Sequence, residues 1–499
     1  MACILALDQG TTSSRAIIFD ENQNILGLAQ RPFEQFFPQP GWVEHSPLEI
    51  WKTQLDVAVE AMANAQLTPR DIAAIGITNQ RETSVVWDRR TGQPLYNAIV
   101  WQDRRTAELC NALRDQDHED YVHNTTGLLL DPYFSASKIR WILDHCEGAW
   151  QLAESGHLAF GTIDSWLIWN LTNGQDHTTD HTNASRTGLL DLNTLDWDSS
   201  LVELWNIPRS LLPTLSASSG EIACCRTSAL EGIPICGVAG DQQAALFGQT
   251  CFTNGMAKCT YGTGCFALLN CGQSPVISNN KLLTTVAWTI GNETDYALEG
   301  SVFIGGALVQ WLRDELGIIE HARDIEPLAE SVQDNGGVVF VPAFSGLGAP
   351  FWDPYARGTI IGLTRGTTKA HIARAALEGI AFQVSDVFGA MTADASGQIT
   401  HINVDGGASE NRMLMQFQAD ILQTQLVRSA QKESTALGAA SLAGLAAGVW
   451  SNRAELTALW RESDRFSPCA PTRSLDAARR QWSNAVGRAQ NWIAPRETQ

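Results

Sequence analysis

The sequence predicts an α/β fold with two large domains. Apolar stretches of strand length alternate with stretches of helix length, and this alternation is typical of α/β proteins. The chain has 499 residues, 44% of them hydrophobic, which suffices for more than one core because single cores stop growing at roughly 250–300 residues. Both halves open with a strand, a turn containing Gly and Thr, and a second strand, which suggests a duplicated unit. We therefore expect domains at residues 1–250 and 251–499.

The first hairpin has the composition of a phosphate-binding turn. Two apolar runs, residues 4–7 and 16–19, flank a polar turn. In that turn Gly10 lets backbone N–H groups approach an anion, hydroxyl groups add donors, and Arg15 adds a positive charge. Asp8 can hold a magnesium ion, directly or through water. Taken alone, these residues fit an ordinary polar hairpin turn equally well.

The elements that follow keep the alternation. Ser46 is placed to cap a helix over residues 47–65. Apolar runs then predict strands over residues 72–78, 83–88, 99–101 and 233–239. The last of these strands leads through Gly-Asp-Gln-Gln into a helix, with Asp241 near its start.

The second half repeats the hairpin and adds another strand, turn and helix. A hairpin over residues 257–269 surrounds Tyr-Gly-Thr-Gly, and residues 401–404 form a strand that ends at Asp-Gly-Gly. Glycines there let a ligand ring or ribose lie against the backbone, although a plain tight turn is an equal alternative. A helix follows over residues 409–421, and the small apolar run 437–450 predicts a packed helix that is too short to cross a membrane.

Composition excludes several classes of function. The net charge of −20 argues against non-specific binding to nucleic acid or to an anionic membrane. The first residues lack the features of a signal peptide, so we expect a cytoplasmic protein with no membrane insertion. Its eleven cysteines contain no Cys-x-x-Cys pair, so we expect reduced thiols and no zinc site.

Six segments, in order along the chain, resemble the FGGY carbohydrate kinases of the actin-like ATPase superfamily. Asp-Gln-Gly-Thr-Thr and Gly-Asp-Gln-Gln mark the wider family, whereas Asn-Gln-Arg-Glu-Thr and Pro-Tyr-Phe-Ser are similar to its glycerol-specific branch. The segments are Leu7–Arg15, Gly41–His45, Thr78–Thr83, Pro132–Ser135, Gly240–Gln243 and Asp405–Gly407.

The resemblance implies two ribonuclease-H-like domains flanking a central cleft that holds ATP, Mg²⁺ and a polyol. The implied reaction is in-line phosphorylation of glycerol to sn-glycerol 3-phosphate in glycerol uptake and catabolism, with Asp241 as general base. By the same resemblance, Asp8 helps to place magnesium, and nucleotide contacts come from Thr11, Thr12, Ser13, Arg15, Thr263, Gly306, Gln310, Gly407 and Asn411. Glycerol contacts come from Arg81, Glu82, Trp101, Tyr133, Asp241, Gln242 and Phe266. Members of the family are commonly dimers or tetramers, so we expect a homodimer or homotetramer.

The residue types at the glycerol positions suit a triol without any resemblance. Hydroxyl groups that donate and accept are satisfied by a carboxylate, a guanidinium and a phenol, and an aromatic wall suits the carbon edge. Taken singly, Arg81 and Glu82 fit an exposed or strand-end ion pair, and Asp241 fits a helix cap. Tyr133 and Trp101 likewise fit plain packing residues, so only the combination favours a polyol site.

Two alternatives stay open. An FGGY kinase for another polyol or a pentulose would share the phosphate turns but hold a longer substrate. An actin-like ATPase scaffold would need those turns without the polyol residues.

Glu231-Gly232-Ile233-Pro234 departs from the Thr-Arg-Ile-Pro of family members that sense a sugar bisphosphate, and residues 221–232 contain no histidine. We therefore expect neither that inhibition nor activation by phosphorylation of a histidine in this loop.

Overall fold

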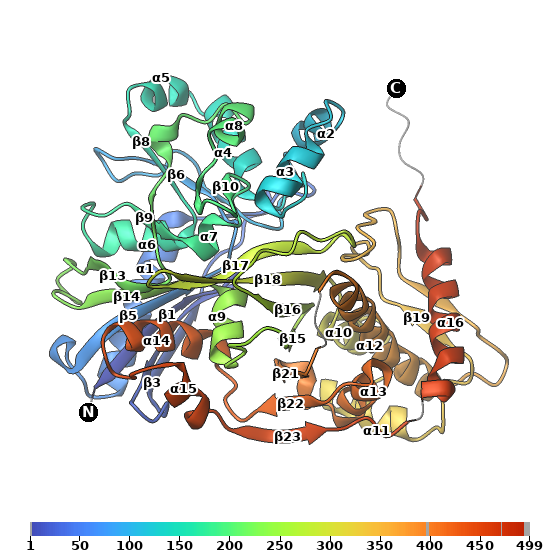
Figure 1. Ribbon diagram of the computed structural model, residues 1–499. Helices are drawn as coiled ribbons and strands as arrows, with labels where there is room; N and C mark the ends of the chain where they lie inside the picture. The colour runs from blue at the N-terminus through green and yellow to red at the C-terminus, as the bar shows by residue number, and fades with distance from the viewer. Residues whose placement is uncertain (1, 396–398, 471, 494–499) are drawn as a thin grey trace.

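One strand arrangement occurs twice at the centre of the molecule (Figure 1). The computed structural model describes residues 2–395, 399–470 and 472–493. Within them, thirteen strands form one sheet in the order β23-β22-β21-β15-β16-β18-β17-β13-β14-β5-β1-β2-β3. The order β3-β2-β1-β5-β14 in the first half matches β18-β16-β15-β21-β22 in the second. Each repeat has three antiparallel strands followed by two parallel strands.

The bounds of these strands agree with the predicted alternation. The first repeat comprises β1 (Cys3–Gln9), β2 (Ser13–Phe19), β3 (Ile25–Pro32), β5 (Ile72–Asn79) and β14 (Pro234–Gly240). The second comprises β15 (Met256–Tyr261), β16 (Cys265–Gly272), β18 (Glu293–Val302), β21 (His401–Asp405) and β22 (Leu426–Ser429). The sheet also contains β13 (Ser219–Cys224), β17 (Leu283–Ile290) and β23 (Glu462–Phe466). The predicted α/β class is confirmed.

Two predicted strands are shorter than expected because turns occupy their ends. β6 (Val85–Asp88) does not include Thr83, whose N–H donates to the Arg81 carbonyl 2.7 Å away in a tight turn. β7 (Ala98–Ile99) stops before the turn in which the Asp103 N–H donates to the Val100 carbonyl. By contrast, α1 (Pro47–Asn64) starts as predicted, and the Ser46 hydroxyl accepts from the Glu49 N–H.

Two crossing helices join the halves. α9 (Asp241–Gly248) follows β14, and α14 (Ser434–Ala446) follows β22. Although α14 is late in the sequence, it packs against β1, β5 and β14, beside the blue strands of Figure 1. A Cβ at Gly438 would lie 1.8 Å from the Ala244 carbonyl oxygen, so this close crossing requires glycine. A segment beyond residue 250 thus contributes to the first core, and the boundary at 250 stays a prediction.

The remaining elements surround the two repeats. Between β5 and β14 the chain forms α2 (Ala107–Arg114), α3 (Glu119–Thr126), α4 (Ser135–His145), α5 (Ala149–Glu154), α6 (Ile163–Leu171), α7 (His181–Ala184) and α8 (Ser199–Leu204). The second half adds α10 (Gly306–Asp314), α11 (Ile325–Glu330), α12 (Lys369–Asp394), α13 (Arg412–Leu422), α15 (Arg453–Leu459) and α16 (Thr472–Ala489). Short pairs are β4 (Glu44–His45) with β7, β6 with β8 (Leu158–Gly161), β9 (Thr178–Asp180) with β12 (Thr214–Ser216), β10 (Leu190–Asp191) with β11 (Asp196–Trp197), and β19 (Val339–Val341) with β20 (Thr359–Ile361).

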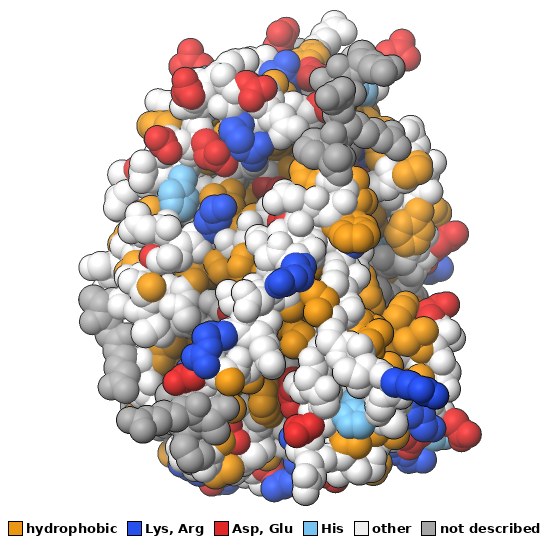
Figure 2. Space-filling model, turned by 90° about the vertical axis from the view of Figure 1, so that its right-hand side faces the viewer, with side chains coloured by type: hydrophobic (Ala, Val, Ile, Leu, Met, Phe, Trp, Pro, Cys, Tyr) orange, Lys and Arg blue, Asp and Glu red, His pale blue; other side chains and the backbone are white. Residues whose placement is uncertain are grey.

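Acidic and basic side chains are interspersed on the side of the molecule on which α16 lies (Figure 1 and Figure 2). Hydrophobic side chains gather near the middle of this face. The exposed large hydrophobic residues of the second half of the chain include Tyr355, Leu363 and Trp492. No helix among the described residues has both the length and the apolar character needed to cross a membrane.

Candidate active site

The segment after β5 brings two charged residues into the interior. Arg81 is 3% exposed and Glu82 is 1% exposed, so the alternative of a surface ion pair is wrong. Their closest contact, Arg81 Nε to Glu82 Oε1, is 3.9 Å, and each makes shorter contacts elsewhere. Glu82 also adopts a φ of 60°, an unfavourable backbone conformation for a residue with a side chain. Buried charge and backbone strain together are characteristic of functional sites.

Arg81 is held by four acceptors. Its Nη1 and Nη2 donate to Glu299 Oε2 and Oε1 at 2.5 and 2.8 Å, which forms a bidentate salt bridge. Nη1 also donates to Gln243 Oε1 at 3.2 Å, and Nε lies 3.1 Å from Asp241 Oδ1. A guanidinium has five N–H groups, so one, on Nη2, is left for a substrate.

Glu82 is held from behind by Arg186. Arg186 Nε donates to Glu82 Oε1 at 2.6 Å and its Nη2 donates to Glu299 Oε1 at 3.2 Å. The guanidinium lies 5.6 Å from the Tyr133 ring centroid. Burial raises the pKa of Glu82, and Arg186 and Arg81 only partly offset this effect. For Glu299, burial is outweighed by the same two arginines, which lower its pKa to about 2.

Sequence reasoning missed both Glu299 and Arg186. A usable signal for Glu299 existed, because it is an acidic residue between Ala297-Leu298 and Gly300-Ser301-Val302, which are small or apolar. Arg186 lies just after the short helix α7 and carries no comparable pattern. The two residues enclose the predicted pair Arg81 and Glu82 in a four-charge network.

Asp241 is the first residue of α9, but it does not cap that helix. Gly240 occupies the cap position, and Asp241 Oδ1 accepts from the Gln242 N–H at 2.7 Å as well as contacting Arg81. Its side chain is 33% exposed, and Oδ2 has no hydrogen bond among the described residues. Burial raises the pKa of Asp241, against the lowering effects of Arg81 and Lys258. A carboxylate oxygen is therefore free beside the Arg81 donor.

Aromatic residues line the same region. The rings of Trp101 and Tyr133 meet edge to face with centroids 5.7 Å apart. Trp101 Nε1 donates to Thr11 Oγ1 at 3.0 Å, which ties the predicted polyol wall to the first Gly-Thr turn. Phe266 on β16 pairs with Ser301 and so points to the same face of the sheet as Glu299. The structure thus places Phe266 on the site side of the sheet without showing a ring contact to Trp101.

The first Gly-Thr turn joins β1 to β2. The Gly10 N–H donates to the Ser13 carbonyl at 3.0 Å, while Thr12 is exposed and Ser13 half-buried. Arg15 pairs with Asp8 across the hairpin at 2.5 Å and with Glu433 at 2.6 Å. Asp8 Oδ2 receives this pair, and Oδ1 makes no hydrogen bond within the described ranges.

The second Gly-Thr turn joins β15 to β16 and carries no charge. Thr263 is exposed at its tip, and the N–H groups of Gly305 and Gly306 donate to the carbonyls of Thr263 and Gly262 at 2.8 Å each. A Cβ at Gly306 would lie 3.8 Å from Ala408, which follows Gly407. The turn, the start of α10 and residues 406–408 therefore converge.

Two predicted nucleotide residues flank this convergence. Gln310 is exposed on α10. Asn411 Oδ1 caps α13 by accepting from the Leu414 N–H at 2.8 Å, and its Nδ2 makes no hydrogen bond to the described residues. Asn411 thus has a structural role that the sequence pattern did not reveal.

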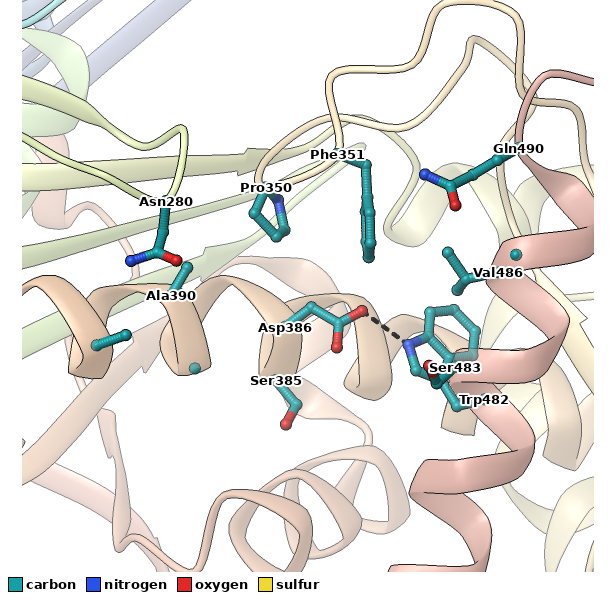
Figure 3. Close-up of a pocket in the computed structure, with 13 residues that line it drawn as sticks. Asn280, Pro350, Phe351, Ser385, Asp386, Ala390, Trp482, Ser483, Val486 and Gln490 are labelled. Atoms are coloured by element: carbon teal, nitrogen blue, oxygen red, sulfur yellow. Dashed lines mark hydrogen bonds between the residues drawn. The ribbon is translucent and has the colours of Figure 1, made fainter.

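A large cavity lies away from all these residues. It measures about 610 Å³ and lies between α12, α16 and the Pro350-Phe351 segment (Figure 3). Trp482 Nε1 donates to Asp386 Oδ2 at 2.7 Å inside it. Burial raises the pKa of Asp386 to about 6, against the opposing effect of that hydrogen bond. None of the predicted site residues lines this cavity.

Comparison with known proteins places these features in a family context. Residues 3–248 match the N-terminal domain, and residues 257–447 the C-terminal domain, of the FGGY family of carbohydrate kinases. The chain is 56% identical over 496 residues to a glycerol kinase of Borreliella burgdorferi, which covers 99% of both chains. It is 57% identical over 498 residues to a glycerol kinase of Trichlorobacter lovleyi, which covers 99% of this chain and 100% of that protein.

Solved structures show the same similarity. A Plasmodium falciparum glycerol kinase crystallised with ADP superposes with a TM-score of 0.93 at 38% identity, and covers 98% of each chain. A xylulose kinase from Lactobacillus acidophilus has a TM-score of 0.88 at 22% identity and covers 98% of this chain and 97% of its own, which shows the shared fold alone.

Proposed function

The chain belongs to the FGGY family of carbohydrate kinases, and we propose that it transfers the γ-phosphoryl group of ATP to a primary hydroxyl of glycerol. The products are sn-glycerol 3-phosphate and ADP. The observation that carries this proposal is the free Asp241 oxygen beside a buried Arg81, in a cluster of side chains that also includes Glu82 and, through Arg186, the Tyr133 ring. This set offers donors and acceptors for a small polyol, and full-length relatives at 56% identity are glycerol kinases.

In the proposed mechanism, some side chains bind glycerol and Asp241 takes part in the chemistry. The remaining Arg81 N–H and the free Glu82 oxygen bind glycerol hydroxyls, and the aromatic wall of Trp101 packs on the carbon edge. Asp241 accepts the proton of the attacking hydroxyl as its oxygen forms the new bond to phosphorus. The bond between phosphorus and the β,γ-bridging oxygen breaks, and ADP leaves with that oxygen.

The two Gly-Thr turns would hold the phosphates from opposite sides. Thr11, Thr12 and Ser13 supply hydroxyl and backbone donors on one side, and Thr263 supplies them on the other. Arg15 adds a positive charge, although it is shared with Asp8 and Glu433. The adenosine would lie by Gly306, Gln310, Gly407 and Asn411, where glycines leave the backbone open.

The donor set fits a magnesium ion carried by the nucleotide. Mg²⁺ in kinases is held by one or two carboxylates together with substrate phosphates, and Asp8 Oδ1 is an unengaged carboxylate oxygen next to the first turn. Among the described residues no group of three His, Cys, Asp or Glu side chains is placed to hold a metal ion. When bound, the ion would neutralise charge on the transferred group.

A coupled assay of ADP release tests the proposal. ATP and magnesium are supplied with glycerol, erythritol, xylulose, ribulose or no acceptor. Release with glycerol alone, with glycerol 3-phosphate as product, is expected. Release with a longer acceptor would retain the kinase fold but refute the pocket assignment. Release without an acceptor would favour the ATPase scaffold.

Location and assembly are further parts of this proposal. Use of ATP to trap glycerol suits the cytoplasm, and fractionation of cells would measure the location. The expectation of a homodimer or homotetramer rests on the family alone, and light scattering of the purified protein would measure it.

A further inference from the structure

Lys258 is a fully buried positive charge with no counter-ion in contact. It lies in β15 with 0% of its surface exposed. Its Nζ donates to Gln242 Oε1 at 2.5 Å and to Thr260 Oγ1 at 3.0 Å, both neutral oxygens. Within the part of the chain that the structure describes, no carboxylate oxygen lies within 4.0 Å of Lys258 Nζ, the distance that defines a salt bridge. A buried ammonium without such a partner is costly, and packing of the sheet gives no reason for it.

The position of Lys258 connects it to the candidate site. Lys258 pairs with Leu268 on β16, which in turn pairs with Glu299 on β18, so the three side chains share one face of the sheet. That face meets α9, which carries Asp241 and Gln242. The ammonium thus reaches from the second repeat to the first residues of a helix that follows the first repeat.

We propose that Lys258 is a positioning residue for phosphoryl transfer, which orients the Gln242 amide toward the polyol and provides a second positive charge near the Asp241 carboxylate. This inference rests on the proposed function and deepens it. None of the motifs in the sequence identified Lys258.

Orientation follows from hydrogen-bond chemistry. An amide has a carbonyl that accepts and an NH₂ that donates, and Lys258 can only donate. Its bond to Gln242 Oε1 therefore fixes which end of the amide faces the lysine. The NH₂ end of Gln242 is then directed away from Nζ and is available to a hydroxyl oxygen of the substrate.

The charge acts on Asp241. Burial raises the pKa of this carboxyl, and Arg81 and Lys258 are the cations that oppose the shift, while Glu299 reinforces it. Burial lowers the pKa of Lys258 itself. The groups that oppose this shift are Asp405, Cys259, Asp241 and Glu299. Asp405 is already engaged by Ser434 and Gln249, so its charge is partly satisfied by other donors. Loss of Lys258 would leave Arg81 as the remaining cation that favours ionised Asp241.

Two substitutions separate these effects. Lys258→Met removes both the charge and the donor, and Lys258→Gln removes the charge but keeps a donor for Gln242. The matched control is Lys52→Met on the exposed face of α1. For each protein we would measure kcat and KM for glycerol across pH, glycerol affinity by calorimetry without ATP, and the melting temperature.

We expect Lys258→Met to lower kcat/KM by about 100-fold and to weaken glycerol binding, in line with loss of a charged hydrogen bond. In both Lys258 variants the acid limb of kcat/KM should move to higher pH by about one unit, because Asp241 ionises less readily. Lys258→Gln should hold glycerol more tightly than Lys258→Met. Melting temperatures should stay close to that of the unmodified protein.

Three results would overturn the inference. The first is an active unmodified enzyme whose Lys258 variants keep its kcat/KM and its acid limb. The second is activity lost only in proportion to unfolded protein, with an unshifted acid limb in the folded fraction. The third is an unmodified protein without polyol-dependent activity, which refutes the proposed function itself. The assay of the unmodified protein distinguishes this result from the first two, in which that protein is active.

Discussion

The two repeats place different chemistry at corresponding strand ends. After β5 and β14, the first repeat presents Arg81, Glu82 and Asp241, all charged. After β21, the second repeat presents Gly406 and Gly407, and the charged residues between β22 and α14, Lys432 and Glu433, are paired with Glu410 and Arg15. The two Gly-Thr turns also differ in charge. Asp8 and Arg15 flank the turn of the first repeat, whereas no charged residue lies in the turn of the second repeat.

Under the proposed function, this difference lets one strand topology bind two different ligands. Charged side chains can satisfy the several hydroxyls of a polyol, whereas glycines let the backbone approach a flat ring and a chain of phosphates. The buried charge of Arg81 in the first repeat is stabilised by hydrogen bonds to Glu299, which comes from the second repeat. The proposed polyol site therefore depends on both halves, although most of its residues come from one.

The largest expected effect concerns the charged strand end of the first repeat. Asp241→Asn should lower kcat by about 1,000-fold, because the proposed general base is lost, while glycerol still binds. Steady-state kinetics and calorimetry measure the two quantities, and Asp115→Asn, on an exposed position, is the control. Turnover within tenfold of the unmodified enzyme would remove Asp241 as the base.

A second prediction concerns stability as a function of pH. Burial raises the pKa of Asp164 on α6 to about 7, with Asp180 adding to the shift, against hydrogen bonds from Thr162 and Thr179. The folded state therefore binds the proton more tightly than the unfolded state, so this contribution is complete below about pH 4 and is lost as pH rises toward 7. The loss is on the order of 4 kcal/mol.

Asp164→Asn should abolish this loss. We expect its melting temperature to rise, relative to the unmodified protein, as pH increases from about 4 to 7. Thermal unfolding at several pH values measures the difference, with Asp115→Asn again as control. Parallel curves for the unmodified protein and Asp164→Asn would contradict a neutral Asp164 in the fold.

A third prediction tests the glycines of the second repeat. Gly406 has a φ of +86°, and a Cβ there would lie 2.5 Å from the Tyr261 carbonyl oxygen. Gly448 has a φ of +72° with open space around it, so it isolates the cost of the backbone conformation. Gly406→Ala should lower stability by about 2–3 kcal/mol and raise KM for ATP, and Gly448→Ala should cost about 1 kcal/mol without affecting KM. Equal effects of the two substitutions on both quantities would show that close approach at Gly406 is unimportant.

The smallest expected effect concerns the link between the polyol wall and the first turn. Trp101→Phe removes the hydrogen bond to Thr11 but keeps an aromatic ring. We expect KM for both glycerol and ATP to rise by about threefold to tenfold, equivalent to about 1 kcal/mol. Trp492→Phe, at an exposed position, is the control. A rise for glycerol alone would show that the wall acts without this link.

Much of the fold was predictable because it follows from local patterns. The hairpins around residues 8–15 and 261–265 follow from apolar runs on either side of Gly-Thr turns, and Ser46 marks the start of α1. The errors lie where a turn replaces strand, as at Thr83, since a hydrogen bond to the Arg81 carbonyl overrides strand propensity. The site residues proposed from sequence stay predictions, but Arg81 contacts Asp241, and Arg186, which shares Glu299 with Arg81, lies beside the Tyr133 ring.

The sequence by itself determined the alternation of strands and helices, the two Gly-Thr turns, and the family to which the chain belongs. Tertiary structure alone decided that Glu299 clamps Arg81 from 218 residues away, and that Lys258 reaches Gln242. It also decided that α14 packs into the first core. The physical reason is that periodicity and turn chemistry are local, whereas the partner of a buried charge depends on which strands the fold sets side by side.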